Sequence, residues 1–239
     1  MQALILAGGK GTRLHPYTSV LPKPLMPVGD YPILEIILRQ MKKAGVNEVI
    51  LAVGYMRQLF QAFFENGARY GLKITYSFEE KPLGTAGPIR LAFDQLEDDF
   101  LVVNGDLLTT LHFDHLFSFH KEMKAAATLG LYRREVKIDF GVIESNAENR
   151  LVRYVEKPTY QFEVSMGVNV FNKKAVDPYL PPGEYLDIPD LMVKLLNEGR
   201  AVYCYHEPCY WLDIGRMEDY QIANEVLESN KSEFVPDLE

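Results

Sequence analysis

The sequence predicts an α/β fold with a mostly parallel sheet, and two observations lead to that prediction. Short apolar or β-branched runs that read as strands occur at 3–7, 48–53, 73–78 and 100–104. Segments with the pattern of helices lie between these runs. Because parallel neighbours need a long crossover connection, strands that alternate with helices favour a Rossmann-like sheet with helices on both faces.

The helical segments carry recognisable start and stop signals. Residues 32–45 begin with Pro32, which suits the first turn of a helix, and end in two lysines and a glycine. Residues 57–67 and 86–96 have a similar character. After about residue 125 the pattern changes, and strand-like segments at 127–133, 140–145, 151–157 and 164–171 precede helices near 188–199 and 216–229. The second half therefore predicts a smaller portion rich in β-structure.

The chain is long enough for one sizeable core, since its 239 residues are 47% hydrophobic. No internal repeat, low-complexity tract or long linker divides it. We therefore expect one compact domain over 1–239, with a core at about 1–125 and a second portion with a C-terminal helix at about 126–239.

Charge and hydropathy exclude several classes of partner. The formal net charge is −8, so the chain as a whole lacks the basic footprint of a nucleic-acid-binding protein. The first apolar run is too short for a signal peptide, and no stretch approaches the ~20 apolar residues of a membrane span. We expect a cytoplasmic protein that binds neither nucleic acid nor membrane, holds any anionic ligand in a local cluster, and is compatible with a homo-oligomer.

The stretch "LILAGGKGTRL" at 4–14 is a glycine-rich loop after the first strand. It lacks the spacing of a Walker A motif, and a dinucleotide fingerprint fails because Leu14 occupies the position of its third glycine. Four prolines interrupt residues 16–27, so no uninterrupted helix can begin before Pro32. The result is a long loop in which bare backbone N–H groups, Arg13 and Lys23 are suited to gripping a polyphosphate.

Three histidines occur in "LHFDHLFSFHKE" at 111–122. His112, His115 and His120 invite a metal-binding interpretation, which we reject. The stretch reads instead as a helix in which His120 continues an apolar stripe formed by Phe113, Leu116 and Phe117.

Residues 6–34, "LAGGKGTRLHPYTSVLPKPLMPVGDYPIL", closely resemble the N-terminal signature of the sugar-1-phosphate nucleotidyltransferases. Further elements follow in the order of that family: "EEKPLGTAG" at 79–87, "VVNGD" at 102–106, "FGVI" at 140–143, "VEKP" at 155–158, "MGVNVF" at 166–171 and "WLDIG" at 211–215. A chance match to one loop would not produce this ordered series along nearly the whole chain.

The resemblance implies a role for each of these elements. The first portion would bind a nucleoside triphosphate, with the loop wrapping its phosphates and the segment at 79–87 reading its base. The implied nucleotide-binding residues are Leu6, Ala7, Gly8, Gly9, Gly11, Thr12, Arg13, Lys23, Glu79, Pro82, Gly84, Thr85, Gly87, Asn104 and Asp106. The second portion would bind the sugar 1-phosphate through Gly141, Glu156, Lys157, Ser165, Gly167 and Asn169.

The implied reaction explains why these residue types recur. A phosphate oxygen of the sugar 1-phosphate attacks the α-phosphorus of the NTP, and pyrophosphate leaves. Because the attacking group is already an anion, positioning and charge neutralisation provide most of the catalysis. The resemblance assigns Mg²⁺ to Asp106 and Asp213 and catalytic contacts with the phosphates to Arg13, Lys23 and Lys157.

The substrate pair is less defined than the reaction. The "PLGTAGP" form of the base segment, at 82–88, looks most like the mannose-1-phosphate guanylyltransferase branch, which favours GTP with a mannose- or heptose-type 1-phosphate. Uridylyl or thymidylyl transfer to glucose 1-phosphate or an amino-sugar 1-phosphate stays open, as does a catalytically silent nucleotide-sugar sensor or regulatory subunit. Ser165 and Asn169 depart from many relatives, which have asparagine and an aromatic residue there, so the sugar side of the pocket is unusual.

Overall fold

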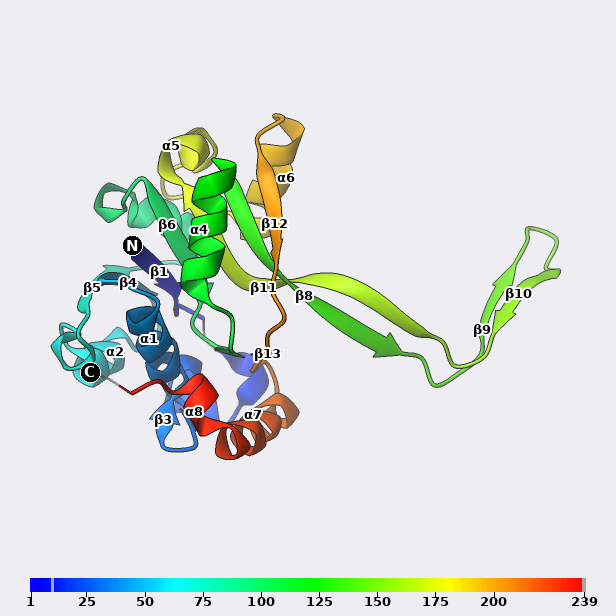
Figure 1. Cartoon of the computed structure of the whole chain (residues 1–239), viewed down its shortest axis with the longest axis horizontal. Coiled ribbons are helices and arrows are strands. Elements are labelled where there is room, and N and C mark those ends of the chain that lie inside the picture. Colours follow the sequence, from blue (N-terminus) through cyan, green and yellow to red (C-terminus); the bar gives the residue numbers. More distant parts are fainter. Residues whose placement is uncertain (10, 238–239) are drawn as a thin grey trace.

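A seven-stranded sheet forms the centre of the computed structural model, which describes residues 1–9 and 11–237 (Figure 1). The strand order is β12-β8-β11-β6-β1-β4-β5. The parallel pairs are β1 with β4 and β6, β4 with β5, and β12 with β8, whereas β11 is antiparallel to β6 and β8. The sheet strands are β1 (Gln2–Leu6), β4 (Glu48–Val53), β5 (Lys73–Phe78), β6 (Asp99–Asn104), β8 (Ala127–Lys137), β11 (Thr159–Asn172) and β12 (Val202–His206). The mostly parallel α/β sheet predicted from the sequence is confirmed.

Smaller pairings and helices complete the described fold. The two-stranded pairings join β2 (Pro27–Val28) to β3 (Tyr31–Pro32), β7 (Leu107–Thr109) to β13 (Trp211–Asp213), and β9 (Val142–Ser145) to β10 (Leu151–Val155). The α-helices are α1 (Ile33–Lys43), α2 (Arg57–Phe64), α3 (Gly87–Leu91), α4 (Phe113–Met123), α5 (Lys173–Val176), α6 (Ile188–Asn197), α7 (Met217–Ser229) and α8 (Lys231–Phe234). The 3₁₀ turns are η1 (Thr12–Leu14), η2 (Tyr17–Ser19), η3 (Lys23–Leu25), η4 (Ala68–Tyr70), η5 (Phe93–Gln95) and η6 (Asp177–Tyr179).

The structure differs from the sequence prediction at one helix and agrees with it in the long loop after β1. The segment predicted as one helix at 86–96 divides into α3 and η5 around Ala92. Between β1 and β2 the described chain forms only the short turns η1, η2 and η3, as the proline argument predicts.

Helices cover both faces of the sheet, and alternate strand residues supply the two cores. Ala3 and Ile5 of β1 pack with α1, α2 and α4, whereas Leu4 packs with α3 and α6. This alternation is the two-residue period of a strand. Strands that are apolar at every position are thus buried from both sides, as the sequence predicts.

A third apolar cluster fixes the C-terminal helices against the edge of this body. Leu108 of β7, Ile214 next to β13 and Leu227 of α7 belong to it. In the β7–β13 pair, Asp213 lies opposite Leu107. This packing brings the end of β13 to the loop that follows β6, over a separation of about a hundred residues.

The order of the parallel strands indicates at which end of the sheet a ligand can bind. β1 lies between β4 and β6. The chain passes from β1 to β4 and β5 through α1 and α2 on one face of the sheet, and it returns from β5 to β6 through α3 on the other face. Open α/β sheets bind ligands at the carboxyl ends of strands where the direction of winding reverses. The glycine loop follows β1 and Asp106 follows β6, so both lie at this end of the sheet.

Beyond the sheet, β8 and β11 continue as a two-stranded ribbon that ends in the β9–β10 hairpin (Figure 1). The ladder runs from Leu131 opposite Ser165 to Lys137 opposite Thr159. We call residues 132–163 the arm. It projects from the body in Figure 1, so the single compact shape expected from the sequence is wrong for this segment.

Among the described helices, none combines the length and apolar character that crossing a bilayer requires.

His120 is buried on α4, and from its burial we expect the folding stability to depend on pH. Its Nδ1 lies 2.9 Å from Thr128 Oγ1, and its Nε2 lies 3.5 Å from Asp99 Oδ1. Burial lowers the pKa of His120, and Asp99 opposes that shift. As the pH falls below about 6.5, the unfolded chain therefore takes up a proton more readily than the folded one, and stability decreases. A single group contributes at most about 1.4 kcal/mol per pH unit.

The measurement compares melting temperatures at pH 7.5 and 5.5. We expect His120→Leu to lose less stability than the wild type over this interval, because it removes the buried titrating group. His206→Leu is the control, since His206 lies exposed at the end of β12. Parallel curves for the wild type and His120→Leu would contradict the assignment.

Candidate active site

Two adjoining cavities open at the carboxyl ends of β1 and β6. The larger has a volume of about 640 Å³ and the smaller about 260 Å³. Leu6, Gly9 and Asp106 line both, so the two cavities meet at these residues. Most of the nucleotide-binding and metal residues predicted from the sequence divide between them. Those that line only the larger cavity are Gly8, Glu79, Pro82, Gly84, Thr85 and Asn104, and those that line only the smaller are Ala7, Gly11, Thr12, Arg13 and Lys23. Gly87 and Asp213 line neither cavity.

Glycines in the first loop allow close packing of its backbone. A Cβ placed on Gly8 would lie 2.6 Å from Glu79 Oε1, so a larger residue would push that carboxylate away. Gly11 has a φ of 59°, in the left-handed region that favours glycine, and its carbonyl accepts a 2.9 Å hydrogen bond from Thr18 Oγ1. At Gly9 a Cβ would meet no atom within 4 Å, so this residue faces the open space shared by both cavities.

Lys23 is a buried cation between two carboxylates. Its Nζ lies 2.6 Å from Asp106 Oδ2 and 3.6 Å from Asp213 Oδ1, while its side chain is only 7% exposed. Burial of a lone ammonium would be costly, so the two aspartates are what stabilises this position. The Ile214 amide donates a 3.1 Å hydrogen bond to the Asp106 carbonyl, which ties the two aspartate-bearing segments together.

Asp106 and Asp213 are suited to holding a divalent cation. Burial raises the pKa of Asp213, as does its neighbour Asp106, and the opposing effects come from Lys23 and Arg13. The ammonium of Lys23 occupies the space between the carboxylates as a cation would. Since hard divalent cations prefer carboxylate oxygens and keep several waters, these residues fit such an ion.

Arg13 lies on the other side of the smaller cavity. An ideal Cβ on Gly215 would lie 3.4 Å from Arg13 Nη1, so the missing side chain there leaves room for the guanidinium. Arg13 itself is exposed. The smaller cavity therefore contains one accessible guanidinium and one buried ammonium, a suitable environment for phosphate oxygens.

The segment at 83–87 is held against the loop that precedes α6. Gly84 has a φ of 77°, and a Cβ on it would lie 2.4 Å from the Leu186 carbonyl oxygen. The amides of Ala86 and Gly87 donate to that same carbonyl at 2.8 and 3.2 Å. These contacts fix the backbone that lines the larger cavity.

Thr85 is hydrogen-bonded across this junction to Asp187 and to the start of α6. Asp187 Oδ1 accepts from the Thr85 amide at 2.9 Å and from Thr85 Oγ1 at 3.2 Å. Thr85 Oγ1 also accepts from the Ile188 amide at 2.8 Å and so caps the first turn of α6. The shape of the segment that we expect to read the base thus depends on a residue 102 positions away in sequence.

Glu79 is the half-buried carboxylate of the larger cavity. Its Oε2 accepts a 3.2 Å hydrogen bond from the Leu83 amide. Burial raises the pKa of Glu79, and the Leu83 hydrogen bond opposes this shift. A carboxylate in this position can accept hydrogen bonds from a ligand's N–H groups.

Three of the residues expected on the sugar side, Ser165, Gly167 and Asn169, lie on β11 where it joins the body, and neither cavity is lined by them. Gly167 has a φ of 71° in the register shift of β11, and a Cβ there would lie 2.4 Å from Asn104 Nδ2. Ser165 Oγ accepts a 3.4 Å hydrogen bond from the Gly167 amide. Asn169 is buried opposite Val102 of β6, and its Oδ1 has no hydrogen-bond partner among the described residues.

The other three expected sugar-side residues lie on the arm. Gly141 precedes β9, and Glu156 and Lys157 follow β10, so they sit together where the hairpin joins the ribbon (Figure 1). A Cβ on Gly141 would lie 3.1 Å from Glu156 Oε2, and Tyr154 Oη donates a 3.1 Å hydrogen bond to the same oxygen. The structure groups these residues with one another but not with Asp106 and Asp213 of the same chain.

Four cavity residues escaped the sequence analysis. Gly54 and Tyr55 directly follow β4, and Tyr185 and Asp187 precede α6. The first pair could have been found from its place after a buried parallel strand, next to the strand that carries the glycine loop. The second pair has no local signal, because only the fold brings it to the cavity.

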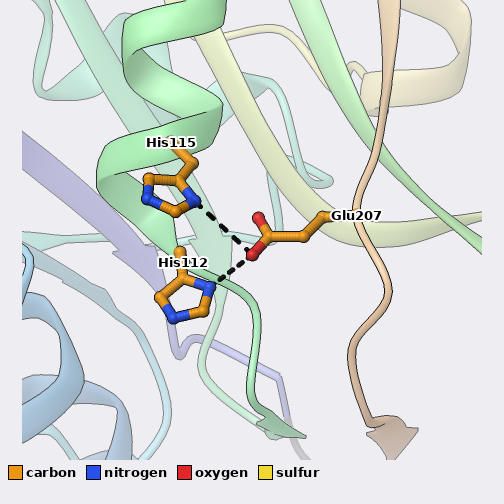
Figure 2. Close-up of side chains that lie close together, drawn as sticks. All are labelled: His112, His115 and Glu207. Carbon is orange, nitrogen blue, oxygen red and sulfur yellow. Dashed lines mark hydrogen bonds and ion pairs between the residues drawn. The ribbon is translucent and has the colours of Figure 1, made fainter.

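The histidines of α4 divide into two environments. His120 lies buried along the packed stripe, which confirms the predicted pattern. His112 and His115 lie more than half exposed at the start of α4 and meet Glu207, as Figure 2 shows. The sequence analysis treated the three histidines as one helix pattern and did not include Glu207.

Comparison with known proteins identifies the family. Residues 2–230 match the family model described as nucleotidyl transferase. The mannose-1-phosphate guanylyltransferase of Mycobacterium tuberculosis is 36% identical over 227 residues, covering 92% of this chain and 62% of that protein. The UTP–glucose-1-phosphate uridylyltransferase of Synechocystis is 31% identical over 239 residues, covering 92% of this chain and 61% of that protein.

Solved structures give the same result for the fold. A Bacillus anthracis structure assigned as a glucose-1-phosphate thymidylyltransferase has a TM-score of 0.77 and 26% identity, covering 95% of both chains. The structure is that of an α/β protein with two adjoining cavities at the carboxyl ends of β1 and β6. The chain belongs to the nucleotidyl transferase family. It spans about three fifths of the length of the two curated relatives described above.

Proposed function

We propose that this chain transfers a nucleoside monophosphate from an NTP to a sugar 1-phosphate, giving a nucleotide sugar and pyrophosphate. The observation that carries the proposal is the cluster of Lys23, Asp106 and Asp213 at the junction of two cavities. One cavity presents a fixed backbone segment and the other a glycine loop with Arg13. This arrangement suits a ligand with a base at one end and phosphates at the other.

In the proposed reaction a phosphate oxygen of the sugar 1-phosphate forms a bond to the α-phosphorus. The bond from that phosphorus to the bridging oxygen of pyrophosphate breaks, and pyrophosphate carries away the electron pair. A divalent cation, Mg²⁺ in this proposal, supplies charge neutralisation at the phosphate oxygens when bound to Asp106 and Asp213. Lys23 and Arg13 hold the phosphates in place, and Lys157 is assigned to the sugar phosphate.

The leading substrate pair is GTP with a mannose- or heptose-type 1-phosphate. Its support is the "PLGTAGP" segment together with the guanylyltransferase from M. tuberculosis, which is 36% identical to this chain. The uridylyltransferase and thymidylyltransferase names among the similar proteins keep glucose 1-phosphate with UTP or dTTP as the alternative. We propose a cytoplasmic site of action.

A pyrophosphate-release assay tests the proposal. Four NTPs are crossed with a panel of sugar 1-phosphates, with Mg²⁺ and with EDTA in its place. We expect release with one or a few pairs, abolished by EDTA. Measurable NTP binding without release for any pair would instead favour the silent sensor or regulatory subunit.

A further prediction concerns the residue that orders the base segment. In Asp187→Ala the Thr85 amide loses its acceptor, so the segment at 83–87 is less well fixed. We expect the KM for the NTP to rise about tenfold, equivalent to about 1.4 kcal/mol, with kcat changed much less. Asp190→Ala, an exposed neighbour in the first turn of α6, is the matched control. An unchanged KM in Asp187→Ala would remove Asp187 from the positioning of the base.

A further inference from the structure

Many large hydrophobic side chains of the arm are exposed to solvent. Eight of the seventeen exposed large hydrophobic side chains among the described residues lie on it, although it is only 32 residues long. They are Val136, Phe140, Ile143, Leu151, Val152, Tyr154, Tyr160 and Phe162. An isolated two-stranded ribbon is marginally stable in water, and exposed apolar patches of this kind mark interaction surfaces.

The arm also carries chemistry that its own body does not use. Gly141, Glu156 and Lys157 are the sugar-phosphate residues of the proposed function, and they lie where the hairpin joins the ribbon, away from the cavities (Figure 1). Seven consecutive residue pairs of β8 and β11 keep the ribbon extended in that direction. Folding the arm back on its own cavities would require breaking or sharply bending this ladder.

Charge permits the arm to approach another copy of the body. Residues 132–163 contain six basic and six acidic residues, so the arm is formally neutral and the rest of the chain carries the whole net charge of −8. A neutral apolar arm meets no net repulsion from an acidic body. Its paired stretch beyond Leu131 extends about 20 Å before the hairpin begins, which is enough to cross onto a neighbouring subunit.

We propose that the arm of one chain covers the cavities of a second copy and supplies Lys157 and Glu156 to its sugar-phosphate site. The proposal rests on the proposed function for the roles of these two residues. Two chains exchange arms about a two-fold axis, so each active site is built from the body of one protomer and the arm of its partner. The apolar arm residues are then buried against the partner.

The molecular mass in solution and cross-linking between chains test the exchange of arms independently of enzymatic activity. Light scattering on the eluting peak should give twice the 27.3 kDa chain mass for the wild type. The double variant Phe140→Asp/Val152→Asp should be monomeric with its own fold intact, since both side chains are exposed within one chain. A photoreactive amino acid at Tyr154 should cross-link labelled to unlabelled chains, at peptides lining the larger cavity. A monomeric wild type at about 50 μM, a dimeric double variant, or cross-links within one chain only would overturn the proposal.

Complementation tests the shared site. Asp106→Asn and Lys157→Ala are each expected to be nearly inactive alone. Co-expressed with different tags, they form hybrid dimers in which one of the two sites combines an intact body with an intact arm. The unseparated mixture should then recover about a quarter of the wild-type rate, because half of the dimers are hybrids. Activity no higher than that of the two parents would overturn the exchange. If the wild type itself releases no pyrophosphate, the proposed function fails. The molecular mass and the cross-links then still show whether two chains exchange their arms.

A second observation, independent of the arm, points to a metal site at the start of α4. The Nδ1 atoms of His112 and His115 both face Oε1 of Glu207, as Figure 2 shows. The His115 Nδ1 to Glu207 Oε1 distance is 3.5 Å, and His112 Nδ1 is hydrogen-bonded to the same oxygen. One potential ligand atom from each of the three residues lies within 4.8 Å of the others.

The surroundings of this cluster favour metal binding over a simple ion pair. Glu207 is 14% exposed, and Tyr205 Oη donates a 2.9 Å hydrogen bond to its Oε2, which leaves Oε1 directed at the two imidazoles. Both histidines are more than half exposed, so water can reach the remaining position. Two imidazoles and one carboxylate with an open position are a ligand set suited to zinc, and imidazole disfavours Mg²⁺.

We infer that His112, His115 and Glu207 bind Zn²⁺ or a similar transition-metal ion, at a site separate from Asp106 and Asp213. Equilibrium dialysis of chelator-treated protein tests this with Zn²⁺ alone. We expect Zn²⁺ to bind in the micromolar range and to be retained in Asp106→Asn. The affinity should fall at least tenfold in His112→Ala and in His115→Ala, and the control His206→Ala should be unchanged. No bound zinc at about 100 μM free ion, or an affinity equal to that of the wild type in either histidine variant, would overturn the assignment.

Discussion

Asp106→Asn is expected to reduce kcat by at least about a thousandfold while leaving the protein folded. The substitution removes a carboxylate that we assign to the divalent cation and that contacts Lys23 at 2.6 Å. The buried ammonium keeps Asp213 as a partner at 3.6 Å, so the cost to stability is modest. Pyrophosphate release gives the rate, and circular dichroism and the melting temperature report the fold.

The matched control for Asp106→Asn is Asp30→Asn, an exposed aspartate whose side chain is 85% exposed and pairs only with Lys231 among the described residues. Its rate should stay within about twofold of the wild type. We expect Asp213→Asn to behave like Asp106→Asn. A near-normal rate in either active-site variant would remove that aspartate from the proposed metal site.

The second large effect is expected for Lys23→Met. Methionine is unbranched and only one atom shorter than lysine, but it leaves Asp106 and Asp213 facing each other without the ammonium. We expect the rate to fall by about 10²–10⁴-fold, because a positive charge that neutralises the phosphates is lost. The variant should also unfold more easily in the absence of metal, since two carboxylates then repel each other in a partly buried site.

Lys23→Met also distinguishes the effect of the Lys23 ammonium from that of the divalent cation. In the wild type a bound divalent ion has to share the carboxylates with Lys23, whereas in Lys23→Met it does not. The rise in melting temperature on adding Mg²⁺ should therefore be larger in Lys23→Met than in the wild type. Lys174→Met, at an exposed position of α5, should change neither the rate nor the response to Mg²⁺. An equal Mg²⁺ response in the wild type and Lys23→Met would indicate that the ion binds elsewhere.

Local sequence patterns predicted the elements well because they depend on short-range geometry. The apolar runs at 48–53 and 73–78 coincide with β4 and β5, and the helix expected at 32–45 appears as α1. The long loop after β1 followed from its prolines alone, since proline cannot sit inside a helix without removing a hydrogen bond. The division of the predicted helix at 86–96 was not visible, because Ala92 gives no breaking signal.

The candidate site was only partly visible in the sequence. The glycine loop, Lys23 and Asp106 could be marked because they follow strands or resemble a known signature. Asp187 could not, because its contact with Thr85 spans 102 residues and depends on how α6 packs on the sheet. Glu207 was missed for the same reason, since it joins His112 across 95 residues.

The arm is the largest difference between expectation and structure. Its hairpin strands were predicted at 140–145 and 151–157, but the ribbon residues 134–137 and 159–163 were not predicted as strand. A strand pattern also does not determine which body a ribbon packs on. Gly141, Glu156 and Lys157 were therefore assigned to the same pocket as Asp106, although the ribbon carries them away from it.

By itself the sequence determined the α/β class, the strands and helices, and the residue types that can grip phosphates, because these follow from periodicity, proline and glycine. Only the tertiary structure decided that Lys23 lies between Asp106 and Asp213, that Asp187 holds the segment at 83–87, and that the arm leaves the body. The physical reason is that a contact between distant segments depends on sheet order and packing, which act across the whole chain and leave no local pattern.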